Sequence, residues 1–270
     1  TIFKNKENRL FIFSLHSTNP EDFEKYKILL NQINNIAPFL HPAEINNYYL
    51  GKFGNSPRSI LTLDDGFIDN YDFAKLILNP LNIKAIFFII PYYIDSNYSS
   101  SDFLNALYPQ LNKKFQSIDL NRYQHLTLDQ VKSLSDFGHT IGIHGYNHES
   151  STSLSTKDLS DLTQRSIKVT DKYLGRVHHY CYPFGSYKDF STATHDLLKS
   201  EFRFIHTGIR GSNSIKEYKK GILKRHMISG HGIDLSYKPY DFGNVFFFAF
   251  NPLSQIPLKI YHILKSILKL

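Results

Sequence analysis

Short apolar runs alternate with amphipathic segments along most of this chain. The runs are rich in Ile, Leu and Phe, as expected for strands buried on both faces. The segments between them place apolar residues at helical spacing and carry residues that start or stop helices. Strands are expected at 10–16, 60–63, 84–90, 140–143, 177–182, 202–207 and 222–228, and helices at 19–34, 69–78, 127–138, 155–174 and 192–200.

The alternation of strands and helices predicts right-handed crossovers and therefore a parallel sheet or barrel. A chain of 270 residues with 41% apolar residues can bury one sizeable core, and α/β barrels of this length are commonly single domains. We expect a single domain over residues 1–270. The sequence contains no repeat and no apolar stretch long enough to span a bilayer.

Residues 91–126 interrupt the alternation, and a connection of this length usually carries function. Tyrosine rings in a surface insertion can stack on sugar rings, or they can pack the insertion against the barrel. Both interpretations apply to the tyrosines found here, which are Tyr92, Tyr93, Tyr98, Tyr108 and Tyr123.

The composition limits the chemistry that is available. Cys181 is the single cysteine, which rules out an internal disulfide and a Cys-rich zinc module. The 13 histidines leave imidazole and carboxylate as metal ligands. The net charge of +7 favours anionic partners such as phosphates, acidic glycans or a membrane surface. The basic residues are scattered without a nucleic-acid motif, so we expect no nucleic-acid partner.

The first residues carry no long apolar segment followed by a small-residue cleavage site, so no signal peptide is visible. We expect this chain in the cytoplasm or at the periphery of a membrane.

Two adjacent carboxylates stand at the end of the buried run 60–63. Consecutive strand residues point to opposite faces, so Asp64 and Asp65 share one site only if the chain turns there. Gly66 permits such a turn. The same three residues also occur in ordinary loops and helix N-caps, so this motif needs support from elsewhere in the chain.

Two histidines provide that support. His144 and His148 follow directly after the strand 140–143, as the two acids follow theirs. The carboxyl ends of barrel strands converge on one rim. Two imidazoles and a carboxylate form a site for one divalent metal ion, with Zn²⁺ expected, and leave positions open for water and substrate. The alternative is that these histidines are loop residues satisfied by backbone groups.

At these motifs the sequence resembles the polysaccharide deacetylases of carbohydrate esterase family 4. The Thr-Phe-Asp-Asp-Gly motif of that family appears as residues 62–66, and its His-x-x-x-His motif as residues 144–148. Its aromatic-Pro-aromatic-Gly loop appears as Tyr182, Pro183, Phe184 and Gly185. The resemblance covers roughly residues 10–230 and implies an α/β fold, a distorted, partly open (β/α)7 barrel.

The resemblance also implies roles for these residues. Asp65, His144 and His148 would hold the metal, and Asp64 would be the general base. The backbone N–H of Phe184 would help to bind the oxyanion. Chemistry supports this division, because a metal that acidifies water needs a free carboxylate nearby to take the proton.

The sequence departs from the best-known family pattern at two places. Cys181 stands where an Arg usually opens the Pro-aromatic loop, and the chain has no tryptophan for the motif that supports a histidine acid. Arg225 is predicted to supply a guanidinium to Asp64 from another strand. His226 is the first candidate for the general acid, although strand alternation turns it away if Arg225 faces the metal. The other candidates are His231 and His16.

The resulting hypothesis is a metal-dependent hydrolase that removes an N-acetyl or N-formyl group from an amino sugar. Its partner would be a bacterial-type surface glycan or a lipid-linked sugar precursor. The same machinery could perform O-deacetylation, because only the leaving group differs. A catalytically idle glycan-binding module is the third alternative.

The tail 256–270 has no place in this chemistry. Its apolar residues project to one half of a helix and its lysines to a narrower arc. Such a helix either packs on the barrel or makes peripheral contact with a membrane beside anionic lipid. The aromatic run 245–250 could extend the same surface.

Overall fold

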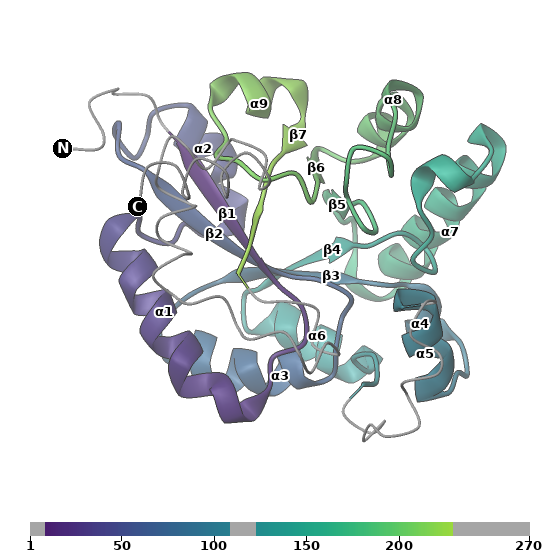
Figure 1. Ribbon diagram of the computed structural model, residues 1–270, viewed down its shortest axis with the longest axis horizontal. Coiled ribbons are helices and arrows are strands. Elements are labelled where there is room, and N and C mark those ends of the chain that lie inside the picture. The colour runs from purple at the N-terminus through teal and green to yellow at the C-terminus, as the bar shows by residue number, and fades with distance from the viewer. Residues whose placement is uncertain (1–8, 109–122, 229–270) are drawn as a thin grey trace, which may run out of the picture.

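The computed structural model describes residues 9–108 and 123–228. Within these ranges eight parallel strands form one curled sheet, a distorted and partly open barrel with helices packed around it (Figure 1). The order of the strands across the sheet is β7-β6-β5-β4-β3-β2-β1-β8. The expected α/β fold is therefore confirmed.

The elements follow the predicted alternation. The strands are β1 (Leu10–Leu15), β2 (Arg58–Leu63), β3 (Ala85–Ile89), β4 (Thr140–Ile143), β5 (His179–Cys181), β6 (Phe204–His206), β7 (Ile222–Leu223) and β8 (His226–Met227). The helices are α1 (Phe23–Ile36), α2 (Ile45–Tyr49), α3 (Asp69–Phe73), α4 (Tyr92–Asp95), α5 (Ser100–Leu107), α6 (Leu128–Asp136), α7 (Thr156–Leu174), α8 (Thr192–Glu201) and α9 (Ile215–Lys220).

The two faces of the sheet bury different clusters, because successive side chains of a strand point to opposite sides. On β1, Phe11, Phe13 and Leu15 pack in one cluster with apolar residues of α1, α3 and α6. Leu10 and Ile12 pack on the other side, inside the barrel, with residues of β2 and β3. In Figure 1, α1, α3 and α6 lie together along one side of the sheet.

The last predicted strand is wrong in one respect. Residues 222–228 form two short strands at opposite edges of the sheet, since β7 pairs with β6 and β8 pairs with β1. Only Lys224 and Arg225 separate them. Asn213 secures this seam, where its Nδ2 donates to Lys224 O at 2.9 Å and its Oδ1 accepts from Lys224 N at 2.8 Å. The barrel thus has eight strands in place of the expected seven.

The described part of the insertion packs against the rest of the domain. Tyr93, Tyr108 and Tyr123 are buried in a cluster with Phe67 and with apolar residues of α5. This observation favours the packing interpretation for these three rings. The tail 256–270, the run 245–250 and His231 lie outside the described residues. Among the helices that are described, none is both long and apolar enough to cross a membrane.

Gly142 in the middle of β4 allows the barrel interior to pack closely. A Cβ at this position would lie 2.4 Å from Cδ1 of Phe88 and 3.3 Å from Cβ of His179. We therefore expect Gly142→Ala to lower the free energy of unfolding by about 1–3 kcal/mol, as overpacking does. Urea unfolding would measure this loss.

A double-mutant cycle supplies the control. Phe88→Leu removes the ring edge that the new methyl group would meet, so the loss in the double variant should be smaller than the sum of the single losses. Strictly additive losses would show that the contact with Phe88 is not the cause.

Candidate active site

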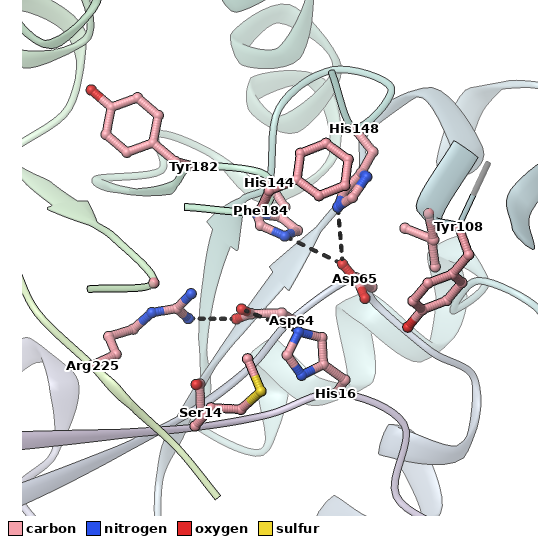
Figure 2. A pocket seen from close by; sticks show the side chains of 13 residues that line it. Ser14, His16, Asp64, Asp65, Tyr108, His144, His148, Tyr182, Phe184 and Arg225 are labelled. Carbon is pink, nitrogen blue, oxygen red and sulfur yellow. Dashed lines mark hydrogen bonds and ion pairs between the residues drawn. The ribbon is translucent and has the colours of Figure 1, made fainter. Parts of the chain in front are cut away.

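The predicted site residues meet at the carboxyl ends of the strands. Asp64 and Asp65 follow β2, and His144 follows β4. They line a cavity of about 160 Å³ that Figure 2 shows from close by. The cavity is lined by Ser14, His16, Asp64, Asp65, Leu107, Tyr108, His144, His148, Tyr182, Phe184, Gly208, Arg225 and Met227.

The turn after β2 brings the two carboxylates to the same cavity. Asp65 and Gly66 both have positive φ, of 70° and 68°. The turn is fixed from outside, because Asp64 N donates to Leu15 O at 2.9 Å and Leu126 N donates to Gly66 O at 2.7 Å. The predicted turn is therefore present, and both carboxylates are almost fully buried.

Asp65, His144 and His148 converge on one point. The Nε2 atoms of His144 and His148 lie 3.3 and 3.4 Å from Oδ1 of Asp65 (Figure 2). One ligand atom from each residue lies within 4.8 Å of the others. All three side chains are buried. This geometry matches the three-ligand set that the sequence predicts.

The hydrogen bonds of the two imidazoles show that this set fits a cation. Nδ1 of His144 lies 2.9 Å from Cys181 O, and Nδ1 of His148 lies 3.4 Å from Ala106 O. A carbonyl oxygen only accepts, so each Nδ1 carries a proton, and the Nε2 that faces Asp65 is the atom of each ring that could bind a metal ion. Two imidazole nitrogens and one carboxylate oxygen thus converge, which is a ligand set that a divalent metal ion prefers.

Asp64 has a different partner. The Nη1 of Arg225 lies 2.7 Å from Oδ1 of Asp64 and 3.1 Å from Oγ1 of Thr62. The Nε of Arg225 donates to Thr207 O at 2.8 Å. The predicted contact between the guanidinium and Asp64 is therefore confirmed.

The surroundings keep both carboxyl groups ionised. Burial would raise the pKa of Asp64, but the Arg225 guanidinium outweighs this effect and lowers the pKa below its usual range. Burial would also raise the pKa of Asp65, but the imidazoles of His144 and His148 outweigh this effect and hold the pKa well below its usual range. Burial also raises the pKa of the Cys181 thiol, so this neighbour of Asp64 stays neutral.

His226, the first candidate for the general acid, does not reach the cavity. It pairs with Phe13 across β8 and β1, and its ring centroid lies 6.0 Å from that of Phe13 and 6.3 Å from that of Phe11. Phe11 and Phe13 pack with α1, α3 and α6 on the outer face of the sheet. The side chain of His226 therefore lies on the opposite face from Arg225, which lines the cavity. The prediction that His226 lies in the active site is therefore wrong, because consecutive residues point to opposite faces and Arg225 occupies the inner face.

His16, one of the other candidates, does line the cavity. It follows β1 directly, and its Nε2 lies 4.0 Å from Oδ2 of Asp64. The side chain is buried, and in Figure 2 it lies beside the two carboxylates.

The aromatic-Pro-aromatic-Gly loop contributes unevenly to the cavity. Phe184 has a φ of 61°, is 50% exposed and lies with its ring 4.7 Å from that of His148. Tyr182 is buried, and its ring stacks on Phe190. Pro183 and Gly185 do not line the cavity. Gly185 lets the loop pack closely against the chain after β6, because a Cβ there would lie 2.4 Å from Gly208 N.

Five residues of the cavity wall are not among the predicted site residues. Leu107 and Tyr108 come from the end of α5, in the insertion, Ser14 and Met227 come from β1 and β8, and Gly208 follows β6. The tyrosine content of the insertion was a signal for Tyr108. Nothing in the sequence pattern marks Ser14, Leu107, Gly208 or Met227, because their position depends on how distant segments of the chain close over the barrel.

Comparison with known proteins agrees with these motifs. Residues 53–200 match the family model described as polysaccharide deacetylase. A peptidoglycan deacetylase of Helicobacter pylori is 31% identical over 81 residues, which is 29% of this chain. The match spans only 27% of the length of that protein.

Solved structures show the same fold. IcaB from Ammonifex degensii superposes with a TM-score of 0.64 at 18% identity, covering 82% of this chain and 92% of its own. The Streptococcus pyogenes deacetylase PplD in complex with acetate gives a TM-score of 0.62 at 20% identity, covering 82% and 93%. At these identities the likeness concerns the fold alone.

Gly66 offers a test of how the turn maintains the site. A Cβ at this position would lie 2.5 Å from Nε2 of His125, in a backbone conformation that side chains avoid. We expect Gly66→Ala to displace the turn, to lower the melting temperature and to weaken divalent-metal binding. Thermal unfolding and metal analysis by mass spectrometry would measure both effects.

Gly51 is the matched control, because its φ of 80° is also positive but a Cβ there would meet no atom within 4 Å. Gly51→Ala should cost only the backbone strain, about 1–2 kcal/mol, and leave metal binding intact. Equal losses in the two variants would contradict the proposed contact with His125.

Proposed function

The chain belongs to the polysaccharide deacetylase family, and on that premise we propose that it hydrolyses the N-acyl group of an amino sugar with the help of one divalent metal ion. The observation that carries this proposal is the convergence of Asp65, His144 and His148 beside a separate carboxylate, Asp64. An acyl-transfer site of this type needs metal ligands and a free base within one small cavity.

Asp65, His144 and His148 would hold the metal ion, and Zn²⁺ suits a set of two imidazoles and one carboxylate. When bound, such an ion acidifies a water molecule and polarises the acyl carbonyl. The carbonyl oxygens of Cys181 and Ala106 orient the two imidazoles, which keeps the ligand geometry fixed.

Asp64 is the general base in this proposal. It accepts the proton of the attacking water while a new bond forms between that oxygen and the acyl carbon. Arg225 keeps the carboxylate ionised and aimed, because its guanidinium is itself held by Thr207 and Thr62. Developing negative charge on the carbonyl oxygen requires a hydrogen-bond donor, the role that the family resemblance assigns to the Phe184 N–H.

His16 is the general acid in this proposal. The C–N bond breaks only when the amine nitrogen receives a proton, and an imidazole is suited to deliver one near neutral pH. His16 lines the cavity, whereas His226 lies on the other face of the sheet. The products are a free amine on the sugar and a carboxylic acid.

An amino-sugar glycan is the proposed substrate class. The rim of the cavity carries Phe184, and Tyr187 lies 77% exposed three residues farther along the same loop. Exposed aromatic rings provide flat apolar surfaces on which sugar rings stack. The relative from Helicobacter pylori is a peptidoglycan deacetylase, which supports a bacterial surface glycan as the substrate, and a lipid-linked precursor stays a prediction. Peripheral membrane contact of the tail stays a prediction.

Metal binding and base catalysis can be separated by substitution. Asp65→Ala and His148→Ala should lose both the bound divalent ion and activity, because each removes a ligand. Asp64→Asn should retain the ion while the deacetylation rate falls by orders of magnitude, since it removes the base alone. Metal content and turnover on a soluble N-acetylated amino-sugar oligomer would be measured on the same preparations.

Full metal occupancy in Asp65→Ala or His148→Ala would refute the ligand set. Near-normal turnover in Asp64→Asn would place the base elsewhere. The catalytically idle glycan-binding alternative requires glycan binding without turnover in the metal-loaded protein.

The bond that is cleaved can be tested with matched substrates. The enzyme should release acetate from an N-acetylated oligosaccharide, because His16 is placed to protonate a poor amine leaving group, and an O-acetylated counterpart assayed in parallel compares the two bonds. An N-formylated counterpart tests the second acyl group. Acetate or formate release would be measured by enzymatic assay, with Asp64→Asn as the inactive control. Preferential release from the O-acetyl substrate would make the protein an O-deacetylase.

A further inference from the structure

A buried polar network connects the loop that carries His16 with the start of α3. Ser17 Oγ donates to Oδ2 of Asp69 at 2.5 Å, and Thr18 Oγ1 donates to Oδ1 of Asp69 at 3.4 Å. Asn70 Nδ2 donates to the backbone oxygen of His16 at 2.9 Å and to Thr18 Oγ1 at 3.1 Å. All five residues are at least nine-tenths buried.

The orientation of the Asn70 amide follows from its partner. A backbone carbonyl oxygen only accepts hydrogen bonds, so the NH₂ group of Asn70 must be the side that faces His16 O. Asn70 therefore holds the backbone of His16 directly. Asp69 holds the two residues that follow His16 through their hydroxyl groups.

The other end of this network is the turn that carries the two acids. Asp69 lies four residues after Asp65 and opens α3, and the intervening chain is anchored by hydrogen bonds from Ile68 N to Gln124 O and from Asn70 N to Phe67 O. The network thus joins two loops that enter the cavity from neighbouring strands, β1 and β2. It holds the backbone of His16 in place relative to the turn that carries Asp64.

We propose that Asp69 and Asn70 are positioning residues, which hold His16 at the place from which it protonates the leaving amine. This inference rests on the proposed function, in which His16 is the general acid. Neither residue lines the cavity, so they act through His16 and not on the substrate. Loss of the network should lower kcat, because a displacement of about 1 Å at a reacting group can cost a hundredfold.

A double-mutant cycle between Asn70 and His16 tests the proposal. Asn70→Ala should lower kcat by about tenfold to a hundredfold, with KM for the N-acetylated oligomer and divalent-metal content unchanged. In the His16→Ala background the same substitution should have no further effect on kcat, because the group that it positions is gone. An equal loss in both backgrounds would overturn the proposal and make Asn70 a structural residue only.

Two further variants keep the test valid if Asn70→Ala folds poorly. Asp69→Asn retains an oxygen that accepts from Ser17, so its kcat should stay well above that of Asp69→Ala. Ser17→Ala removes one donor to Asp69 and should lower kcat, whereas Ser166→Ala removes a buried serine hydroxyl bonded to Leu162 O on α7 and should not. Equal kcat values for Asp69→Asn and Asp69→Ala, or for Ser17→Ala and Ser166→Ala, would contradict positioning.

The cycle also separates this inference from the proposed function. If His16→Ala retains full kcat, His16 is not the general acid and the positioning role falls with it. If His16→Ala loses kcat but Asn70→Ala does so independently of His16, the proposed function stands and the positioning role alone is wrong.

Discussion

The ion pair between Asp64 and Arg225 is the interaction on which the site depends. Both side chains are buried, and a buried charge without a partner is costly. The guanidinium donates to Asp64, to Thr62 and to the carbonyl of Thr207, and its carbon lies 5.7 Å from the centroid of the Phe88 ring. These contacts come from β2, β3 and the chain after β6, so the group that keeps Asp64 ionised also joins the two sides of the barrel.

Unusual backbone conformations also help to form the site. Among the described residues other than glycine, four have positive φ, and three of them line the cavity, namely Asp65, His148 and Phe184. Each such conformation costs about 1–3 kcal/mol and persists only where neighbouring contacts fix it. Here the neighbours are the turn at Gly66, the His148 contact with Ala106 and the close approach of Gly185 to Gly208. These strained conformations turn side chains that follow strands back over the barrel and into the cavity.

Local sequence was sufficient for the parts of the site that lie at strand ends. Asp64, Asp65, His144 and His148 follow apolar runs that end sharply, and the parallel topology then places them together. The division of residues 222–228 into two edge strands depends on how the sheet closes, which no local pattern encodes. His226 was favoured over His16 because of its order in the sequence. Strand alternation already indicated that the side chain of His226 lies on the face opposite to that of Arg225. The wall from α5 could not be predicted, because its place depends on packing between distant segments.

Cys181 and Arg225 together explain why the missing loop arginine does not leave the site incomplete. What Asp64 requires is a cation at a point in space, and the strand that delivers it is immaterial to the electrostatics. The end of β5 holds the small neutral thiol of Cys181, whose Sγ lies 4.0 Å from Oδ2 of Asp64. The guanidinium of Arg225 binds the other oxygen, Oδ1. An arginine at both positions would place two like charges against one carboxylate in a buried site. The short segment between β7 and β8 supplies this charge through Arg225, so the segment that links the two edges of the sheet also keeps Asp64 ionised.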